Sequence, residues 1–449
     1  MARYENKKAT RSDSVFTNDR GSIISDLSSV RFLWRGVDTI RQLYNCSVRP
    51  EVFDAITNHW ETAKDDVIIL EGMEFKLSSS GKAAGYKYIL KNLEAGVIVL
   101  FKSMYCEADK QGPHIKIEAT PQLIQELGLQ KLTNYLRQVA SIFAETLEAS
   151  GVAVHLACDF KGWEPPQDFE ANLVTRSKRN LRVNALTAAH NQSVSEVALV
   201  YGQGQTYMFG ESGSLQFCMY EKSAEAIKSR KLEFCESLWS QVPSVDDPTR
   251  PEYNDGSDGT EADTVRRVEF RIHQSIIKEF EHGHFNVTQQ LDEKGNIVSP
   301  GELCCIREAR DLIPHLQGLW EYCLNNFRYQ YSTTYVHPLW SMLADDVEWF
   351  GFAEGWTYKR GKKKSLDGVS NRNVAMWLGN WLRIAAAKGL KTSFVVNQIM
   401  SAGADSMVAD YFGVRLYGNT TEVVSLLTEF VERRMRDHRL NGVGGLKVA

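Results

Sequence analysis

The sequence predicts an α+β protein, in which an antiparallel sheet has helices on one face and a mainly helical C-terminal region follows. Segments of β-branched and aromatic residues alternate with polar residues between positions 67 and 119, and again at 152–160, 215–222 and 265–272. Helical periodicity predominates after residue 302. With 449 residues and 43% hydrophobic content, the chain is long enough to form more than one core.

Composition sets the expected domain boundaries. Residues 1–28 are polar and rich in Ser, Asn and Asp, so we expect a flexible N-terminal tail. Residues 29–285 would form the α+β domain. Within it, residues 243–263 hold seven acidic residues against one arginine, together with three prolines, which predicts a disordered acidic insertion. Residues 302–449 would form the mainly helical C-terminal region.

The expected elements follow in order along the chain. Four strands are expected at 67–78, 86–93, 95–103 and 114–119. Thr120 and Pro121 supply an N-cap and a first-turn proline for a helix that reaches about Ala149. The later elements are a strand from Val152, a hairpin at 200–222 turned at 211–214, a helix at 223–239, a strand at 265–272 and a helix near 274–281.

Bulk charge and cysteine use restrict the function classes. The net charge of −4 gives no overall electrostatic attraction to nucleic acid, so DNA binding would need a local basic surface. Eight scattered cysteines without a CxxC pair are typical of a reducing, cytoplasmic compartment. No apolar run reaches the 18 residues of a membrane span, and no GxxxxGK[ST] loop indicates an ATPase.

A tyrosine and a lysine lie two positions apart in the segment LQFCMYEK. Alternation places Tyr220 and Lys222 on the polar face of a strand, opposite Phe217 and Met219. A phenol can attack a phosphate, and an ammonium group beside it can stabilise the developing charge. The alternative is a half-buried strand tyrosine beside a solvated lysine.

The segment VRRVEFRI has the same alternation. Arg267, Glu269 and Arg271 share one face, and the apolar residues share the other. A glutamate between two arginines could bind a divalent metal while the arginines hold phosphates. The alternative is a ladder of ion pairs between strands.

Other metal-ligand candidates lie elsewhere. Asp159 stands at the end of its expected strand, and His155 is on the same face about 13 Å away, too far to share one ion without strand curvature. His282 and His284 form the one HxH of the chain, but at an expected helix exit with a glycine between them, which is typical of a loop. The segment LVTRSKRN is a local basic patch, with candidate DNA-binding residues at Arg176, Lys178 and Arg179.

Several of these segments resemble, in the same order, the replication initiation factor family, which includes rolling-circle plasmid and phage initiators and related conjugative relaxases. VHLACDFKGW resembles a strand of the form RxDLxxDFxGW, and LVTRSK resembles the basic segment after it. TYMFGESGSLQFCMYEKSAEAIKS resembles TxxxGSxxSxxxxRxYDKxxEIxxS, and VRRVEFRI resembles the strand WRxEFxxR. The resemblance covers residues 150–340, and more loosely the chain back to about residue 32.

The resemblance implies nicking of one origin strand by a tyrosine, with a 5′-phosphotyrosine intermediate and a divalent metal, Mg²⁺ or Mn²⁺. Tyr220 would then be the nucleophile, Lys222 an electrostatic helper and Tyr207, on the facing strand, the reserve nucleophile. Asp159 and Glu269 would bind the metal, with His155 in a place where the family has an aspartate. Arg267 and Arg271 would hold DNA phosphates. Cys218 stands where the family commonly has an arginine.

The implied partners are double- and single-stranded origin DNA, with a host helicase, a polymerase and a second copy of the chain as further candidates. The sequence leaves two other functions open. One is a conjugative or mobilisation relaxase with the same chemistry, and the other is an origin-binding regulatory protein without catalysis.

Overall fold

A computed structural model describes residues 7–62, 66–79, 85–175, 179–180, 207–241, 264–349, 351–361, 371–401, 408 and 420–440. The protein divides into two compact units, Met1–Lys362 and Lys363–Ala449. The expected acidic insertion at 243–263 lies outside the described residues, as do Arg176 and Lys178. Arg179 is described only through its backbone, in strand β12.

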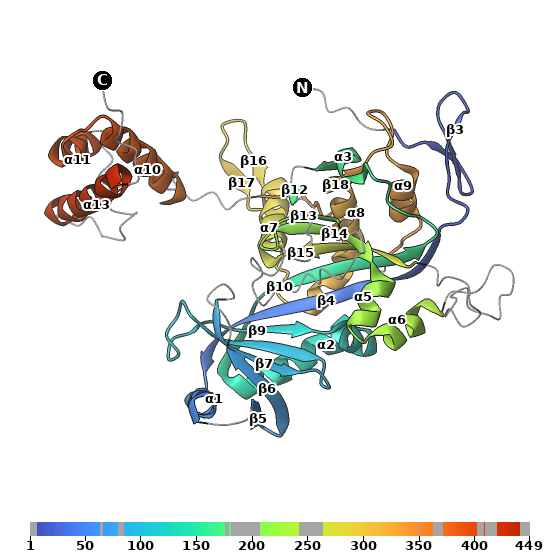
Figure 1. Cartoon of the computed structure of the whole chain (residues 1–449), viewed down its shortest axis with the longest axis horizontal. Helices are drawn as coiled ribbons and strands as arrows, with labels where there is room; N and C mark the ends of the chain where they lie inside the picture. Colours follow the sequence, from blue (N-terminus) through green and yellow to red (C-terminus); the bar gives the residue numbers. More distant parts are fainter. Residues whose placement is uncertain are drawn as a thin grey trace. The chain divides into compact units, whose positions relative to one another are not determined.

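The first unit is α+β, as the alternation predicts, and its main element is an eleven-stranded sheet in which every pair is antiparallel. The strand order is β12-β13-β14-β15-β10-β4-β9-β8-β7-β6-β5 (Figure 1). The strands are β4 (Arg31–Val48), β5 (Val67–Leu70), β6 (Met73–Ser79), β7 (Tyr86–Asn92), β8 (Val97–Ser103), β9 (Gly112–Ala119), β10 (Ala144–Lys161), β12 (Arg179–Asn180), β13 (Tyr207–Gly210), β14 (Leu215–Glu221) and β15 (Arg266–Ile272).

One face of this sheet forms the main hydrophobic core. Alternation along β10 turns Val154, Leu156 and Phe160 into that core, where each is fully buried. The helices that contribute to the core are α1 (Pro50–Thr62), α2 (Pro121–Phe143), α3 (Phe169–Asn172), α7 (Gln274–Thr288), the 3₁₀ helix η2 (Ala309–His315), α8 (Leu316–Asn326) and α9 (Pro338–Asp345). The opposite face of β4, β14 and β15 is therefore left for polar side chains.

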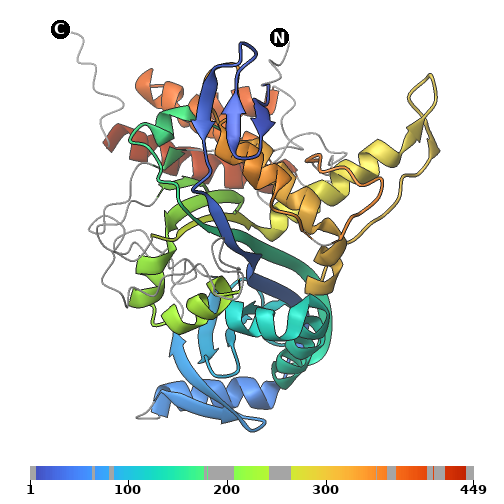
Figure 2. The same cartoon turned by 90° about the vertical axis from the view of Figure 1, so that its right-hand side faces the viewer.

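Two short helices lie on that polar face. They are α5 (Lys222–Lys228) and α6 (Leu232–Trp239), seen in lime green beside the central strands in Figure 2. Trp239 and Cys235 pack there with Leu33 of β4 in a small separate cluster. Residues of these two helices line the polar face, in addition to the helices on the core face.

The predicted flexible tail is wrong for the residues that are described. The chain forms a three-stranded sheet of β1 (Thr10–Ser12), β2 (Val15–Thr17) and β3 (Ile23–Asp26), drawn in dark blue in Figure 2. Phe16 is 1% exposed and belongs to the main core. The Arg11 guanidinium donates two hydrogen bonds to the Asp346 carboxylate, at 2.6 and 2.8 Å. These contacts tie down a segment whose polar composition gives little sign of them.

The predicted start of a C-terminal region at residue 302 also needs correction. Trp320 and Leu343 are fully buried in the core of the first unit. Strand β18 (Phe327–Tyr329) pairs with β11 (Leu173–Thr175), which joins this segment to the α+β domain. The segment is largely helical, as its periodicity predicts, but the apolar faces of its helices pack in the core of the sheet. The helical second unit begins at Lys363.

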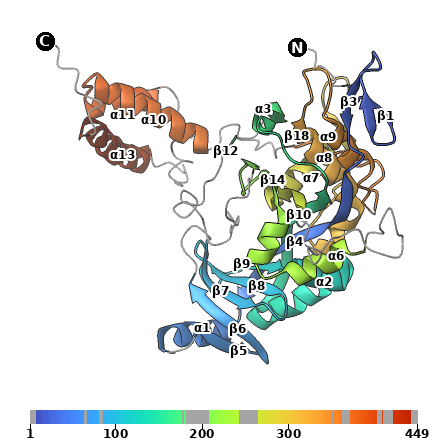
Figure 3. The ribbon, with the colours of Figure 1, turned by 45° about the vertical axis from the view of Figure 1, so that its right-hand side comes forward.

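The second unit is helical in its described part. It contains α10 (Asn371–Ala387), α11 (Thr392–Ser401) and α13 (Thr420–Leu440), labelled in Figure 3. Val423, Leu427 and Val431 of α13 are fully buried, four residues apart, and face Leu378 and Val395 of the other two helices. None of the helices within the described ranges is long and apolar enough to cross a membrane.

The first unit departs from the predicted elements at further places. The expected strand at 67–78 is two strands, β5 and β6, and the expected helix at 223–239 is two helices, α5 and α6. Helix α2 ends at Phe143, and strand β10 begins at Ala144, where a helix to about Ala149 was expected. Residues 144–149 pair with the end of β4, with Ala144 opposite Val48. This long-range pairing overrides the local helical pattern and gives β10 its 18 residues.

Candidate functional site

Four neighbouring strands bring polar side chains to one face of the sheet. The strand order β14-β15-β10-β4 places Tyr220 opposite Arg267 and Arg267 opposite Asp159. Two residues after Arg267 on β15, Glu269 pairs with Cys218 of β14 on one side and with Ala157 of β10 on the other. The strands that carry Tyr220, Glu269 and Asp159 are therefore neighbours in the sheet.

A bulge in β4 adds a carboxylate that the sequence reasoning missed. Val37 pairs with Leu156 and Thr39 with His155, so Asp38 is an extra residue without a partner on β10. Bulges of this kind are common beside functional sites because they redirect a side chain. Asp38 consequently lies with His155 and Glu269, and ligand atoms of the three lie within 4.8 Å of one another.

Glu269 is the centre of the polar face. Its carboxylate is 2% exposed, and the Tyr220 hydroxyl donates to its Oε2 at 2.9 Å. Its Oε1 accepts from Arg271 Nε at 2.8 Å and lies 3.1 Å from His155 Nδ1. Burial alone would raise the pKa of Glu269, but Arg271 and the hydrogen bond from His155 outweigh it and hold that pKa well below its usual range.

The protonation states of the neighbours follow from burial. Burial lowers the pKa of His155, so the imidazole is neutral and able to act as a ligand. Burial raises the pKa of the Tyr220 phenol well above its usual value, and the Glu269 carboxylate adds to the increase. The phenol therefore keeps its proton at neutral pH unless a further positive charge enters the site.

Asp159 is placed differently from the expectation. Both of its oxygens accept from Arg267, at 2.5 and 2.8 Å, and the Trp239 indole donates to one of them at 2.9 Å. The carboxylate is fully buried and does not belong to the group of possible ligands around Glu269. We therefore correct its role from metal ligand to partner of a buried arginine.

Arg267 is also unsuited to the role expected for it. Its guanidinium is 2% exposed, forms ion pairs with Asp159 and Asp38, and lies 5.0 Å above the Trp34 ring. All of these contacts are internal, so the residue organises the site and is not placed to hold a DNA phosphate. Arg271 is more accessible, with 19% of its side chain exposed, although it is paired with Glu269.

Tyr207 lies on the wrong face to be a reserve nucleophile. It pairs with Met219, is 1% exposed and packs 4.8 Å from the Phe169 ring in the main core. Its neighbour Met208 faces the polar side instead. Lys222 does line the polar side near Tyr220, where its ammonium is ion-paired with Glu225.

Side chains of the polar face of the sheet and of helices α5 and α6 surround a cavity of about 310 Å³. Its lining holds six cationic and four acidic side chains, although the whole chain has a net charge of −4. Four of the cationic side chains are ion-paired with the four acidic ones, so the excess of positive charge in the lining comes from Lys91 and Lys231. The cationic side chains are Arg41, Lys91, Lys222, Lys231, Arg267 and Arg271, and the acidic ones are Asp38, Glu118, Glu225 and Glu269.

Comparison with known proteins gives one clear relationship. No family model matches the chain. A protein of Pseudomonas phage Pf1, described as "Uncharacterized protein ORF430", is 34% identical over 380 residues, which cover 83% of this chain and 81% of the phage protein. The chain therefore belongs to the family of that phage protein.

Proposed function

We propose that this member of the ORF430 family is a DNA strand-cleaving and strand-joining enzyme that starts rolling-circle replication through Tyr220. The observation that carries the proposal is the tyrosine hydroxyl, 2.9 Å from Glu269 at the edge of the Asp38–His155–Glu269 group. The relative is a phage protein, and its description assigns it no activity. The resemblance to replication initiation factors supplies the reaction.

The residues of the candidate group suit an oxygen-preferring divalent ion. Two carboxylates and one neutral imidazole are ligands that Mn²⁺ accepts, and the set contains no thiol. The lowered pKa of Asp38, where Arg267 outweighs the effect of burial, keeps that carboxylate charged. A divalent ion bound there would polarise a phosphate oxygen and favour the ionised phenol.

The proposed cleavage step uses the hydrogen bond between Tyr220 and Glu269. The Tyr220 oxygen bonds to the scissile phosphorus, and the bond from phosphorus to the 3′ oxygen breaks. The phenolic proton passes to Glu269 Oε2, which it already faces, and the departing 3′ oxygen takes a proton from water. Because the pKa of Tyr220 is raised and that of Glu269 is lowered, this transfer is unfavourable in the protein alone. We therefore expect cleavage to require the metal.

The cavity supports the phosphate-binding part of the proposal. Arg271 and Lys222 reach its lining from the strand and helix next to the tyrosine, and the excess of cationic side chains favours an anion. The remaining partners, namely origin DNA, a helicase, a polymerase and a second copy, follow from the resemblance alone. A relaxase acting in DNA transfer would use the same site and the same step.

The test is to capture the covalent intermediate. The full chain is incubated with Mn²⁺ and single-stranded DNA from the replication region of the replicon that encodes it, and adducts are mapped by peptide mass spectrometry. We expect a nucleotide on the Tyr220 peptide, no adduct in Tyr220→Phe and normal adduct in the matched control Tyr207→Phe. Metal-dependent DNA binding without any adduct in the wild type would instead indicate a binding protein and refute the enzyme.

A further inference from the structure

A second group of possible metal ligands lies outside the cavity, where residues 300–307 cross helix α7. Glu281, His284 and Thr288 share one face of the helix because they are three and four residues apart. The crossing segment is held at both ends, since Thr288 Oγ1 accepts from the Glu302 amide at 3.0 Å and Glu281 Oε1 accepts from the Ile306 amide at 2.7 Å. The residues between these two points are thereby held against His284.

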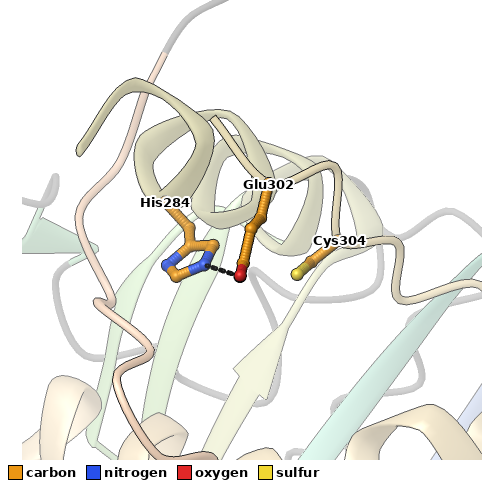
Figure 4. A group of neighbouring side chains, drawn as sticks. All are labelled: His284, Glu302 and Cys304. Atoms are coloured by element: carbon orange, nitrogen blue, oxygen red, sulfur yellow. Dashed lines mark ion pairs between the residues drawn. The ribbon is translucent and has the colours of Figure 1, made fainter. Parts of the chain in front are cut away.

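The close approach of the two segments is built into the sequence at Gly301. A Cβ atom on this residue would lie 2.3 Å from the Phe285 carbonyl oxygen, which no side chain could accommodate. The glycine lets the crossing chain touch the backbone of α7 one turn from His284. Glu302 and Cys304 then extend over the same helix face (Figure 4).

His284 is oriented toward that group and is poorly satisfied by the protein. It is 4% exposed, and its ring stacks on Trp356 with centroids 4.3 Å apart and planes 11° from parallel. Among the described residues its Nδ1 has no hydrogen-bond partner. Its Nε2 faces the Glu302 carboxylate at 3.7 Å, which is too long for a hydrogen bond (Figure 4). The unsatisfied Nδ1 makes this imidazole costly to bury, and Nε2, which faces Glu302, is the nitrogen placed to bind an ion.

We propose that His284, Glu302 and Cys304 bind a thiophilic divalent ion such as Zn²⁺, which clips the crossing segment to helix α7. The three ligand atoms lie within 4.8 Å of one another. Two ligands of a tetrahedral zinc ion are about 3.4 Å apart, so the separation of His284 and Glu302 already fits and the sulfur needs to move by roughly 1 Å. Three protein ligands leave a fourth position for water.

The chemistry of the ligands separates this site from the cavity group. A thiolate with an imidazole selects zinc-like ions over Mg²⁺, whereas the Asp38–His155–Glu269 group offers no sulfur. Burial raises the pKa of the Cys304 thiol, and the Glu302 carboxylate adds to the increase. Binding therefore forms a metal–sulfur bond as the S–H bond breaks, and the proton goes to solvent. The proposal does not depend on the proposed function.

Co²⁺ is the probe that tests the site, because a thiolate bound to Co²⁺ gives a charge-transfer band in the near ultraviolet. The full chain is stripped with a chelator and titrated with Co²⁺. We expect the band to saturate at one equivalent and to disappear when Zn²⁺ is added. His284→Gln should weaken the affinity tenfold or more.

The adjacent pair of cysteines supplies the matched control. Cys304→Ser should abolish the band, and Cys305→Ser, at an exposed cysteine outside the group, should retain it. Far-ultraviolet circular dichroism of each variant checks that the protein is folded. Absence of the band in the wild type, or its loss in Cys305→Ser but not in Cys304→Ser, would overturn the proposal.

Discussion

The buried pair of Asp159 and Arg267 gives the most direct test of the structure, because an expected metal ligand has become a structural ion pair. The perturbation is Asp159→Asn, which keeps the size of the side chain and removes its charge. The Asp159 carboxylate accepts two hydrogen bonds from Arg267 and one from Trp239. In an asparagine the amide oxygen can still accept, but the amide nitrogen is a donor and would face another donor.

The magnitude follows from burial. Asp159 is fully buried and Arg267 is 2% exposed, so the guanidinium would keep the Asp38 carboxylate as its one ionic partner among the described residues. Removing one partner of a buried ion pair typically costs about 3–5 kcal/mol, because the other charge is left uncompensated. The matched control is Glu279→Gln, which breaks the more exposed pair with Arg360 and should cost about 0–1 kcal/mol.

The assay is urea unfolding of the full chain, followed by tryptophan fluorescence, with the midpoint and slope compared between the two variants and the wild type. We expect Asp159→Asn to lower the midpoint clearly while the slope stays constant, and Glu279→Gln to leave both unchanged. Equal, small losses of less than about 1 kcal/mol in the two variants would refute the reasoning, because Asp159 would then behave as a solvated carboxylate.

Three further predictions concern the polar face. Since burial lowers the pKa of His155, its neutral form stabilises the folded state above about pH 6.5, and this contribution is lost as the pH falls. Unfolding free energy measured from pH 7.5 to 5 should therefore fall more steeply in the wild type than in His155→Gln, by up to about 1.4 kcal/mol per pH unit, and parallel curves would contradict this. Asp38→Asn should weaken Mn²⁺ binding tenfold or more in calorimetric titrations, and unchanged affinity would remove Asp38 from the ligand group. Gly36→Ala should lower the free energy of unfolding by about 1–3 kcal/mol, because the added Cβ would lie 2.3 Å from the Trp34 ring. The control Gly213→Ala meets no atom within 4 Å and should be neutral in the same unfolding assay. Equal effects of the two substitutions would argue against the close contact at Gly36.

Alternation along single strands was enough to predict the two faces of β14 and β15. It set Tyr220 on the polar side of its strand and grouped Glu269 with Arg271 on the polar side of theirs, and the structure pairs these two strands. Both inferences rest on local pattern, because a strand turns successive residues to opposite faces whatever its partners are. The metal, the DNA and the reaction stay predictions.

The position of Tyr207 shows where local pattern fails. A four-residue turn at 211–214 would pair Gly210 with Leu215, and thus Tyr207 with Cys218 on the polar face. The structure pairs Gly210 with Gln216 and Tyr207 with Met219. One added residue in the turn therefore moved the tyrosine into the core, since a shift of one position exchanges the faces of a strand.

The spacing of residues along the sequence could not show which carboxylates belong to the candidate metal site either. The oxygens of Asp159 are occupied by Arg267, 108 residues later, and by Trp239, 80 residues later. Such contacts depend on how distant segments pack, and they decide whether an aspartate is available to an ion. Asp38 gave one weak signal, as an acidic residue in a strand of mainly apolar and aromatic neighbours.

Asp38 lies in a bulge, so it could be deleted without changing how its strand pairs with β10. Val37 and Thr39 pair with consecutive residues of β10, so deleting Asp38 would leave every other pair of β4 and β10 in its present register. The strand would lose this bulge, and the cavity would lose one carboxylate. The sheet can thus be inherited with or without this residue, and a natural one-residue gap at this position would mark relatives that keep the architecture but lack one carboxylate of the proposed metal site.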